Sequence, residues 1–171
     1  MDADLASPFQ KLTHSLDELV KLYRALFDIV RKEKELLIAS DIENLNESNK
    51  TKEAVLLKVR TEDLVREKTA IELCKVVGAD PRNPRLLEIA KKMKGEQAEN
   101  LRQYHSTLTL MIERVSELNK ENEIYTKSAL RVLGRAMNEV KETLSGKKTY
   151  EKKGKMNEGP MQAGNFVSKE A

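Results

Sequence analysis

The sequence is poor in the residues that build a wide globular core or a disulfide framework. Among 171 residues there is one cysteine, no tryptophan and four prolines, and only 4% are aromatic. A single cysteine cannot form an internal disulfide, which is typical of cytosolic proteins. No apolar run reaches the roughly 18 residues of a membrane span, and the N-terminal residues lack the pattern of a secretory signal. We therefore expect a cytoplasmic protein without stable membrane insertion.

An excess of charge of one sign is also missing from most of the chain. Residues 1–144 hold 25 basic and 25 acidic side chains, so the net charge of +3 comes from residues 145–171. A nucleic-acid-binding domain usually carries a basic face with aromatic side chains for stacking, and the balanced part has neither. We expect no nucleic-acid partner.

Groups suited to catalysis or metal binding are few. The two histidines, His14 and His105, are far apart in the sequence, and Cys74 has the apolar neighbours of a buried structural thiol. No Glu-x-x-His pair, zinc-ligand spacing or glycine-rich phosphate loop occurs. The sequence therefore predicts no enzyme activity, no cofactor and no metal site.

The dominant feature that is present is a heptad pattern over residues 96–144. Apolar or small residues recur there at alternating spacings of four and three, which places them on one face of a single helix about 70 Å long. The positions are Gln97, Leu101, Tyr104, Leu108, Met111, Val115, Leu118, Asn122, Tyr125 and Ala129.

A first long helix is predicted to begin with Ser7 as N-cap and Pro8 in the first turn, and to end near Ala39. Its apolar seam, interrupted by Glu33, consists of Phe9, Leu12, Leu16, Leu19, Tyr23, Leu26, Val30 and Leu37. Ser40–Glu43 has the pattern of a capping box. The second helix should therefore follow almost without a loop and pack antiparallel to the first.

The second long helix is predicted to end at Val77, because Gly78 can supply the left-handed residue after the last turn. Its two apolar faces suggest two neighbours: Leu45, Leu56, Val59, Ala70 and Leu73, interrupted by Asn49, Lys52 and Asp63, on one face, and Leu57, Leu64 and Ile71 on the other. Asn83 as N-cap and Pro84 should start a short helix, with a bend allowed at Gly95.

Together these patterns predict an all-α protein. Residues 1–144 should form an elongated antiparallel helical bundle or coiled coil of three long helices with a short extra helix. Residues 145–171, which hold four of the seven glycines and six lysines, should form a flexible basic tail.

Near the end of residues 96–144 the apolar seam shifts by one position, which is a turn of about 100° around the helix. The large apolar residues there are Leu130, Leu133, Met137, Val140 and Leu144. Roughly the last 18 residues of this helix also exceed the length of the first one. The shifted residues are therefore either an exposed docking stripe or, if the seam only drifts, a contact with the second helix.

Several short patterns occur in a recognisable order. They are Leu36, Leu37, Ser40, Asp41 and Leu45 at the first helix junction, Lys50, Lys52, Leu56, Leu57 and Arg60 after it, Asn119, Asn122 and Tyr125 in the long helix, and Thr149, Tyr150 and Gly154 in the tail. In this order and spacing, which covers most of the chain, the sequence resembles the FlgN family of flagellar type III export chaperones.

The resemblance implies a cytoplasmic, all-helical chaperone of bacterial flagellum assembly. Family members hold the C-terminal amphipathic helices of the hook–filament junction proteins, prevent their premature association and deliver them to the cytoplasmic domain of the export gate. On this sequence the resemblance implies that the stripe at residues 130–144 binds substrate and that Tyr150 contacts the gate. Glu151 replaces the glycine that is common after that tyrosine. An exposed stripe would also allow weak self-association.

Two other functions fit the residues without the resemblance. One is a generic coiled-coil adaptor or structural subunit, for which the tail is only a linker. The other is binding to an anionic surface through the tail lysines, which predicts a steep dependence on salt.

Overall fold

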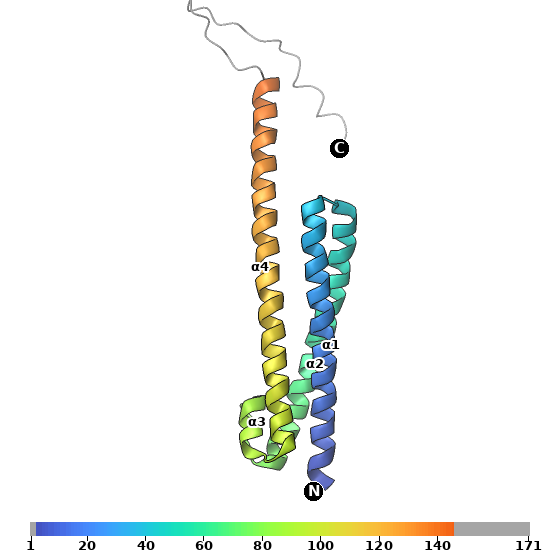
Figure 1. The fold of residues 1–171 in the computed structure, drawn as a ribbon, viewed down its shortest axis with the longest axis vertical. Coiled ribbons are helices and arrows are strands. Elements are labelled where there is room, and N and C mark those ends of the chain that lie inside the picture. Colours follow the sequence, from blue (N-terminus) through green and yellow to red (C-terminus); the bar gives the residue numbers. More distant parts are fainter. Residues whose placement is uncertain (1–2, 146–171) are drawn as a thin grey trace, which may run out of the picture. The chain divides into compact units, whose positions relative to one another are not determined.

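The computed structural model describes residues 3–145 of the chain as four helices, with no strand among them (Figure 1). They are α1 (Ala3–Ala39), α2 (Ile42–Val77), α3 (Leu86–Lys92) and α4 (Glu96–Leu144). The predicted all-α bundle of three long helices and one short one is confirmed. The bounds predicted for the end of α1, the end of α2 and the whole of α4 are also confirmed.

The chain divides into two compact units, Met1–Glu123 and Ile124–Ala171, and the boundary falls within α4. The first unit contains α1, α2, α3 and the first part of α4. The described part of the second unit is the end of α4 and Ser145. The predicted tail lies outside the described residues except for Ser145, so the division of the chain at residue 144 stays a prediction.

The start of α1 differs from the prediction. The helix begins at Ala3 and Pro8 lies inside it, so Ser7 is not the N-cap. A proline in a helix interior removes one hydrogen bond, in this case the bond to the carbonyl of residue 4, and crowds the preceding turn. Only about one turn precedes Pro8, so the cost is confined to the first residues of α1.

The junction between α1 and α2 is as tight as predicted, but the capping residue is Asp41 rather than Ser40. Asp41 Oδ1 accepts a hydrogen bond from the backbone N–H of Asn44 at 3.2 Å, and the Asn44 amide donates to Asp41 Oδ2 at 2.7 Å. The bond from the Asn44 side-chain amide, followed by the bond from the Asn44 backbone N–H, holds the pKa of Asp41 below its usual value. Ser40 has a φ of 55°, a left-handed turn conformation that an N-cap does not adopt.

At the other end of α2, Gly78 is the left-handed C-cap as predicted, with φ 72° and ψ 31°. The prediction that Asn83 caps the short helix was wrong, because Arg85 is the residue before α3 and makes no side-chain capping bond. Asn83 instead donates its N–H to the carbonyl of Asp80 at 3.0 Å in a turn. Gly95, with φ 69°, separates α3 from α4, so the chain turns at the place where a bend was allowed.

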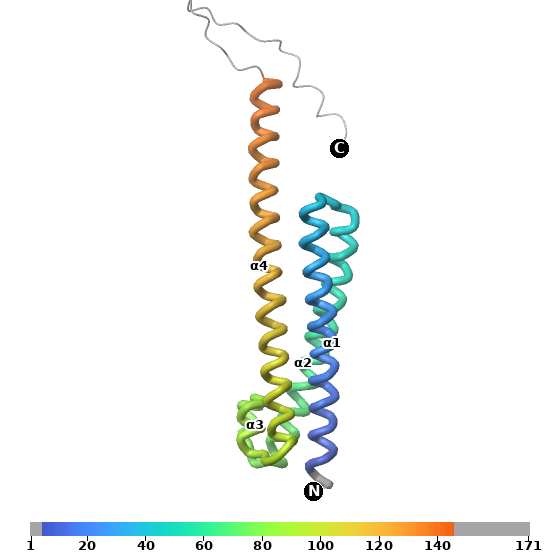
Figure 2. The backbone as a smooth tube through the Cα atoms, in the orientation of Figure 1, coloured from blue at the N-terminus to red at the C-terminus, as the bar shows by residue number. Residues whose placement is uncertain are grey.

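Within the first unit α1 and α2 run antiparallel, and the first part of α4 runs in the same direction as α1 (Figure 2). Side chains fix the pairing of α1 with α4. The Tyr104 hydroxyl donates to Asp17 at 2.6 Å, and the Asn122 amide donates to the carbonyl of Val30 at 2.9 Å. Burial, followed by the hydrogen bond to Asp17 and its negative charge, raises the pKa of Tyr104 to about 12.

The core lies along the predicted seams. Its buried members include Leu12, Leu16 and Leu19 from α1, Ala70, Leu73 and Cys74 from α2, Ile89 and Ala90 from α3, and Leu101 and Leu108 from α4. The prediction that both apolar faces of α2 are covered was wrong. Leu57 and Leu64 on its second face are 65% and 67% exposed, and only Ile71 is half-buried.

Candidate functional site

The five apolar residues singled out near the end of α4 are all strongly exposed. The exposed fractions are 62% for Leu130, 57% for Leu133, 64% for Met137, 58% for Val140 and 66% for Leu144. At about 100° per residue they fall within about 80° of one another around the helix. We call these five residues the α4 stripe. A strip of this width matches the seam that a helix presents to one partner helix.

A second row of apolar residues widens this face and was not part of the predicted site. It consists of Tyr125, Ala129, Val132 and Ala136, which are all exposed and continue the seam that is buried earlier in α4. With this row the apolar face of α4 spans about 160°. In the sequence this row is the continuation of the main heptad seam of residues 96–144, whereas the α4 stripe is the set shifted from it by one position.

One flank of the α4 stripe is basic. Lys127, Arg131 and Arg135 follow one another at every fourth position, and no acidic residue occurs in residues 124–138. Among the described residues neither Arg131 nor Arg135 forms an ion pair. In the first unit, by contrast, several exposed charges are paired one helical turn apart, for example Lys21 with Glu18 at 2.7 Å and Arg102 with Glu99 at 3.1 Å. Arg131 and Arg135 are therefore available to an acidic partner.

Gly134 lies on the same helix between the stripe and the basic flank. A Cβ atom added there would meet nothing within 4 Å, so no contact in the described residues explains a glycine at this position. In the interior of a helix glycine costs about 1 kcal/mol relative to alanine. Because Gly134 has no side chain, the backbone of a partner could approach α4 closely at this position beside the exposed apolar residues.

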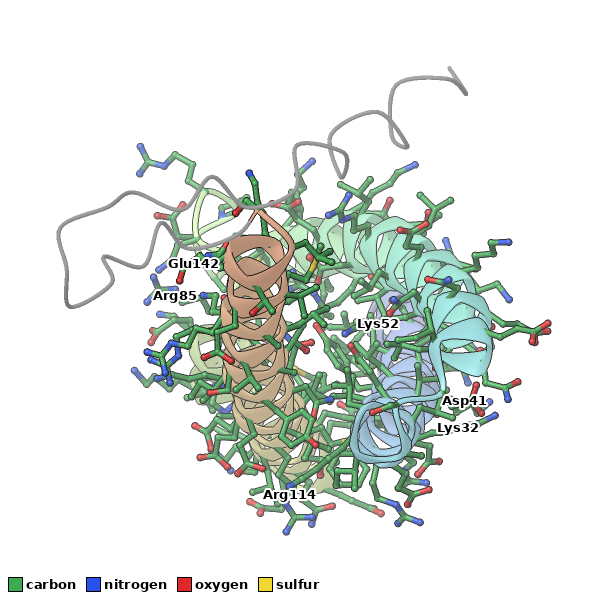
Figure 3. All side chains as sticks on the ribbon, turned by 90° about the horizontal axis from the view of Figure 1, so that it is seen from above. Lys32, Asp41, Lys52, Arg85, Arg114 and Glu142 are labelled. Carbon is green, nitrogen blue, oxygen red and sulfur yellow. The ribbon has the colours of Figure 1, made fainter. Side chains whose placement is uncertain are left out.

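The buried seam of α4 ends in a polar layer. Lys52 of α2 binds Glu33 of α1 and Asn119 of α4, each at 2.7 Å, and Figure 3 labels Lys52 among the side chains between the helices. The side chains of Lys52 and Glu33 are only 18% and 14% exposed. Glu33 interrupts the predicted apolar seam of α1, and Lys52 interrupts that of α2. In the structure these two side chains form an ion pair with each other.

The residues considered for catalysis or metal binding lie apart from these surfaces. Cys74 is buried in the core, and burial raises the pKa of its thiol, which disfavours the reactive thiolate. Within residues 3–145 no group of three or more histidine, cysteine or acidic side chains could hold a metal ion. Tyr150, the predicted contact with the export gate, lies outside the described residues.

The comparison with protein families agrees with this architecture. A family model described as "FlgN protein" matches residues 1–158. No curated protein and no solved structure matches the chain. In the described part of the chain, no helix has the length and apolar character needed to cross a membrane. Because the family match covers nearly the whole sequence, the chain belongs to the FlgN family of flagellar export chaperones.

Proposed function

We propose that this chaperone binds the C-terminal amphipathic helices of the hook–filament junction proteins on the α4 stripe. The observation that supports the proposal is the exposure of five large apolar side chains on one face of one helix. Soluble proteins rarely leave such a face uncovered unless a partner uses it. A substrate helix laid along the stripe would bury its own apolar face at the same time, which would keep it from associating prematurely.

The energetics favour a transient complex. Complete burial of a large aliphatic side chain contributes about 1.5–3 kcal/mol, so five that are more than half exposed would contribute roughly 5–8 kcal/mol. Association itself costs at least about 4 kcal/mol. The stripe alone therefore gives weak binding. Val132 on the second row and Arg131 and Arg135 on the basic flank would supply the rest of an affinity in the micromolar range.

Delivery to the type III export gate would then use the segment that directly follows the stripe in the sequence. Residues 1–144 act as the helical chaperone domain and residues 145–171 as a basic tail that carries Tyr150. This division separates the group that holds the substrate from the group that contacts the cytoplasmic domain of the gate. Tyr150→Ala should weaken binding to that domain, measured by calorimetry, and leave substrate binding unchanged. Loss of both activities would contradict the division.

Calorimetric titration with C-terminal fragments of the junction proteins tests the substrate site. Leu133→Asp combined with Met137→Asp should abolish measurable binding, because each carboxylate would be desolvated against the substrate. Leu57→Asp combined with Leu64→Asp is the matched control, since these leucines of α2 are equally exposed. Binding that survives the first pair, or that fails equally with the control, would contradict the proposal.

Truncation after Leu144 separates the contribution of the stripe from that of the tail. We expect the truncated protein to bind substrate with some weakening, because the tail lysines add only general electrostatic attraction. If neither the full chain nor the truncated form binds any junction-protein fragment, the generic adaptor function is the better account of this chain.

A further inference from the structure

A groove runs along the first unit between α2 and α4. It consists of two hollows of about 420 Å³ and about 440 Å³, which share Tyr23 of α1 and Ile112 of α4. Residues of α1 line both hollows, and α2 and α4 contribute residues on either side. Among the described residues, α1 and α2 approach each other to within 8 Å between Cα atoms, whereas α4 comes that close to neither of them. The two hollows therefore lie where α4 is spaced from the α1–α2 pair, and a fourth helix placed there would complete a four-helix bundle.

The two ends of the groove are marked by different structures. At one end it is bordered by α3 and by Arg85, which precedes it. At the other end it is bordered by Lys52 and Asn119, which bind each other in the polar layer. The lining positions on α4 extend from His105 to Asn119, a distance of about 21 Å at 1.5 Å per residue. A helix of about 14 residues has this length.

The lining of the groove is apolar but only partly covered. Ile112 is 45% exposed and Leu87 is 38% exposed, while Tyr23, Leu56 and Val115 are half-buried. These side chains come from all four helices: Leu87 lines one hollow, Leu56 and Val115 line the other, and Tyr23 and Ile112 line both. Partly covered apolar side chains along the axis of a bundle are the surface that an amphipathic helix binds through residues spaced three and four apart.

The charges in the groove indicate the polarity of its occupant. Lys52 is paired with Glu33, Arg66 with Asp63, and Glu88 with Lys91, each at 2.7 Å. Arg85 has no ion pair within residues 3–145. One unneutralised positive charge thus stands at the α3 end of the groove. The C-terminal turn of a helix, which carries partial negative charge, or an acidic side chain on that turn would be attracted to it.

We infer that the groove is a second docking site, separate from the α4 stripe. Its occupant is an amphipathic helix of about 14 residues in a partner protein, with acidic residues in the turn that lies beside Arg85. The helix lies along the two hollows, with its first turn against the polar layer and its last turn beside Arg85. This site does not depend on substrate binding at the stripe, so the chaperone can hold two helical segments at once.

The test uses the full-length protein and a fluorescently labelled synthetic peptide of about 15 residues, held helical by a lactam bridge. The peptide has leucines spaced three and four apart and two glutamates in its last turn. We expect saturable binding by anisotropy that Ile112→Asp weakens at least about 10-fold. Leu57→Asp, on the exposed face of α2 outside the groove, should leave it unchanged. Circular dichroism melting confirms that both variants are folded.

A second pair of measurements separates the groove from the stripe. Because the α4 stripe would also bind an amphipathic helix, the titration is repeated in the Leu133→Asp with Met137→Asp variant, where saturable binding that Ile112→Asp weakens should remain; loss of all binding there would assign the peptide to the stripe and overturn the inference. The unchanged protein should bind the peptide with two glutamates in its last turn better than one with two lysines there. Arg85→Glu, a change at an exposed position, should reverse this order, so that the lysine peptide binds better. Absence of saturable binding, or equal affinity of Arg85→Glu for both peptides, would also overturn it.

Discussion

The two parts of α4 have the same heptad spacing of apolar residues, but these residues are covered in the first part and exposed in the second. From Leu101 to Asn122 the apolar seam is buried or half-buried, and Asn122 is only 3% exposed. From residue 127 to the end of the helix every residue is exposed, although the apolar side chains are as large and as regularly spaced. Heptad periodicity therefore establishes that a helix has an apolar face. It does not establish that the face is covered within the same chain.

The difference in charge follows the difference in burial. The first unit pairs many of its exposed charges along its own helices or between them, as with Lys34 and Glu121 at 2.8 Å. In residues 124–138 the charges are all basic. A helix that is stable by itself gains from alternating charges one turn apart. Arg131 and Arg135 form no ion pair among the described residues, and an acidic partner would supply one.

The largest contrast is expected between two leucines on this one helix. Leu101 is fully buried, so Leu101→Ala should lower the free energy of unfolding by about 2–5 kcal/mol through lost burial and a residual cavity. Leu133→Ala should change it by less than about 0.5 kcal/mol. Urea denaturation followed by circular dichroism measures both. Similar losses would mean that Leu133 is packed in solution.

The polar layer at the end of the buried seam gives the next effect. Lys52→Met removes the partner of Glu33 and of Asn119 and should destabilise the protein by about 1–3 kcal/mol. Replacing Glu33 by leucine at the same time should restore much of the loss, because an apolar pair avoids the desolvation of both charges. Lys58→Met, at an exposed position of α2, is the control. A loss of the same size there would show that the layer contributes nothing specific.

A smaller effect is expected at alkaline pH, through Tyr104. Its pKa in the folded protein is raised from 10.0 to about 12, so its contribution to stability is complete below pH 10 and is lost as the pH rises to about 12. The hydroxyl is partly accessible to solvent, so we expect a change of only about 1 kcal/mol. Unfolding measured from pH 9 to 12 should show a shallower decline for Tyr104→Phe. Parallel declines would contradict the assignment.

The smallest effect is expected from two glycines that differ in backbone conformation: Gly134 is helical, and Gly78 has a positive φ. Gly134→Ala should stabilise the end of α4 by up to about 1 kcal/mol, seen as slower amide exchange in residues 124–144. Gly78→Ala should instead destabilise the protein by about 1 kcal/mol, because its φ of 72° is unfavourable for alanine. If Gly134→Ala weakens substrate binding although the helix is more stable, the partner approaches α4 at this point.

The helix ends set by glycines were predictable from the sequence, whereas the N-cap residues were not. Gly78 and Gly95 set helix ends that depend only on neighbouring residues, and the bounds they imply are confirmed. The N-caps predicted at Ser7, Ser40 and Asn83 were wrong, because capping depends on the backbone angles of the residue and not only on its type. Serine, aspartate and asparagine all fit the pattern, and tertiary context selects among them.

For the candidate site, the sequence identified the five residues of the α4 stripe but could not decide whether they are covered. Whether they bind substrate stays a prediction, and so does the role of Tyr150. The groove was not predictable, because it arises from the spacing between α4 and the α1–α2 pair, which no local pattern encodes. The pairing of Glu33 with Lys52 was similarly hidden, since each appeared only as a break in its own seam.

Amide hydrogen exchange with and without a junction-protein C-terminal fragment tests the central claim most directly. In the free protein, residues 124–144 should exchange much faster than residues 100–122, because their apolar face is uncovered. With substrate bound, residues 124–144 should gain protection of at least about 10-fold while the first unit changes little. Protection gained only elsewhere, or slow exchange of residues 124–144 in the free protein, would contradict the account.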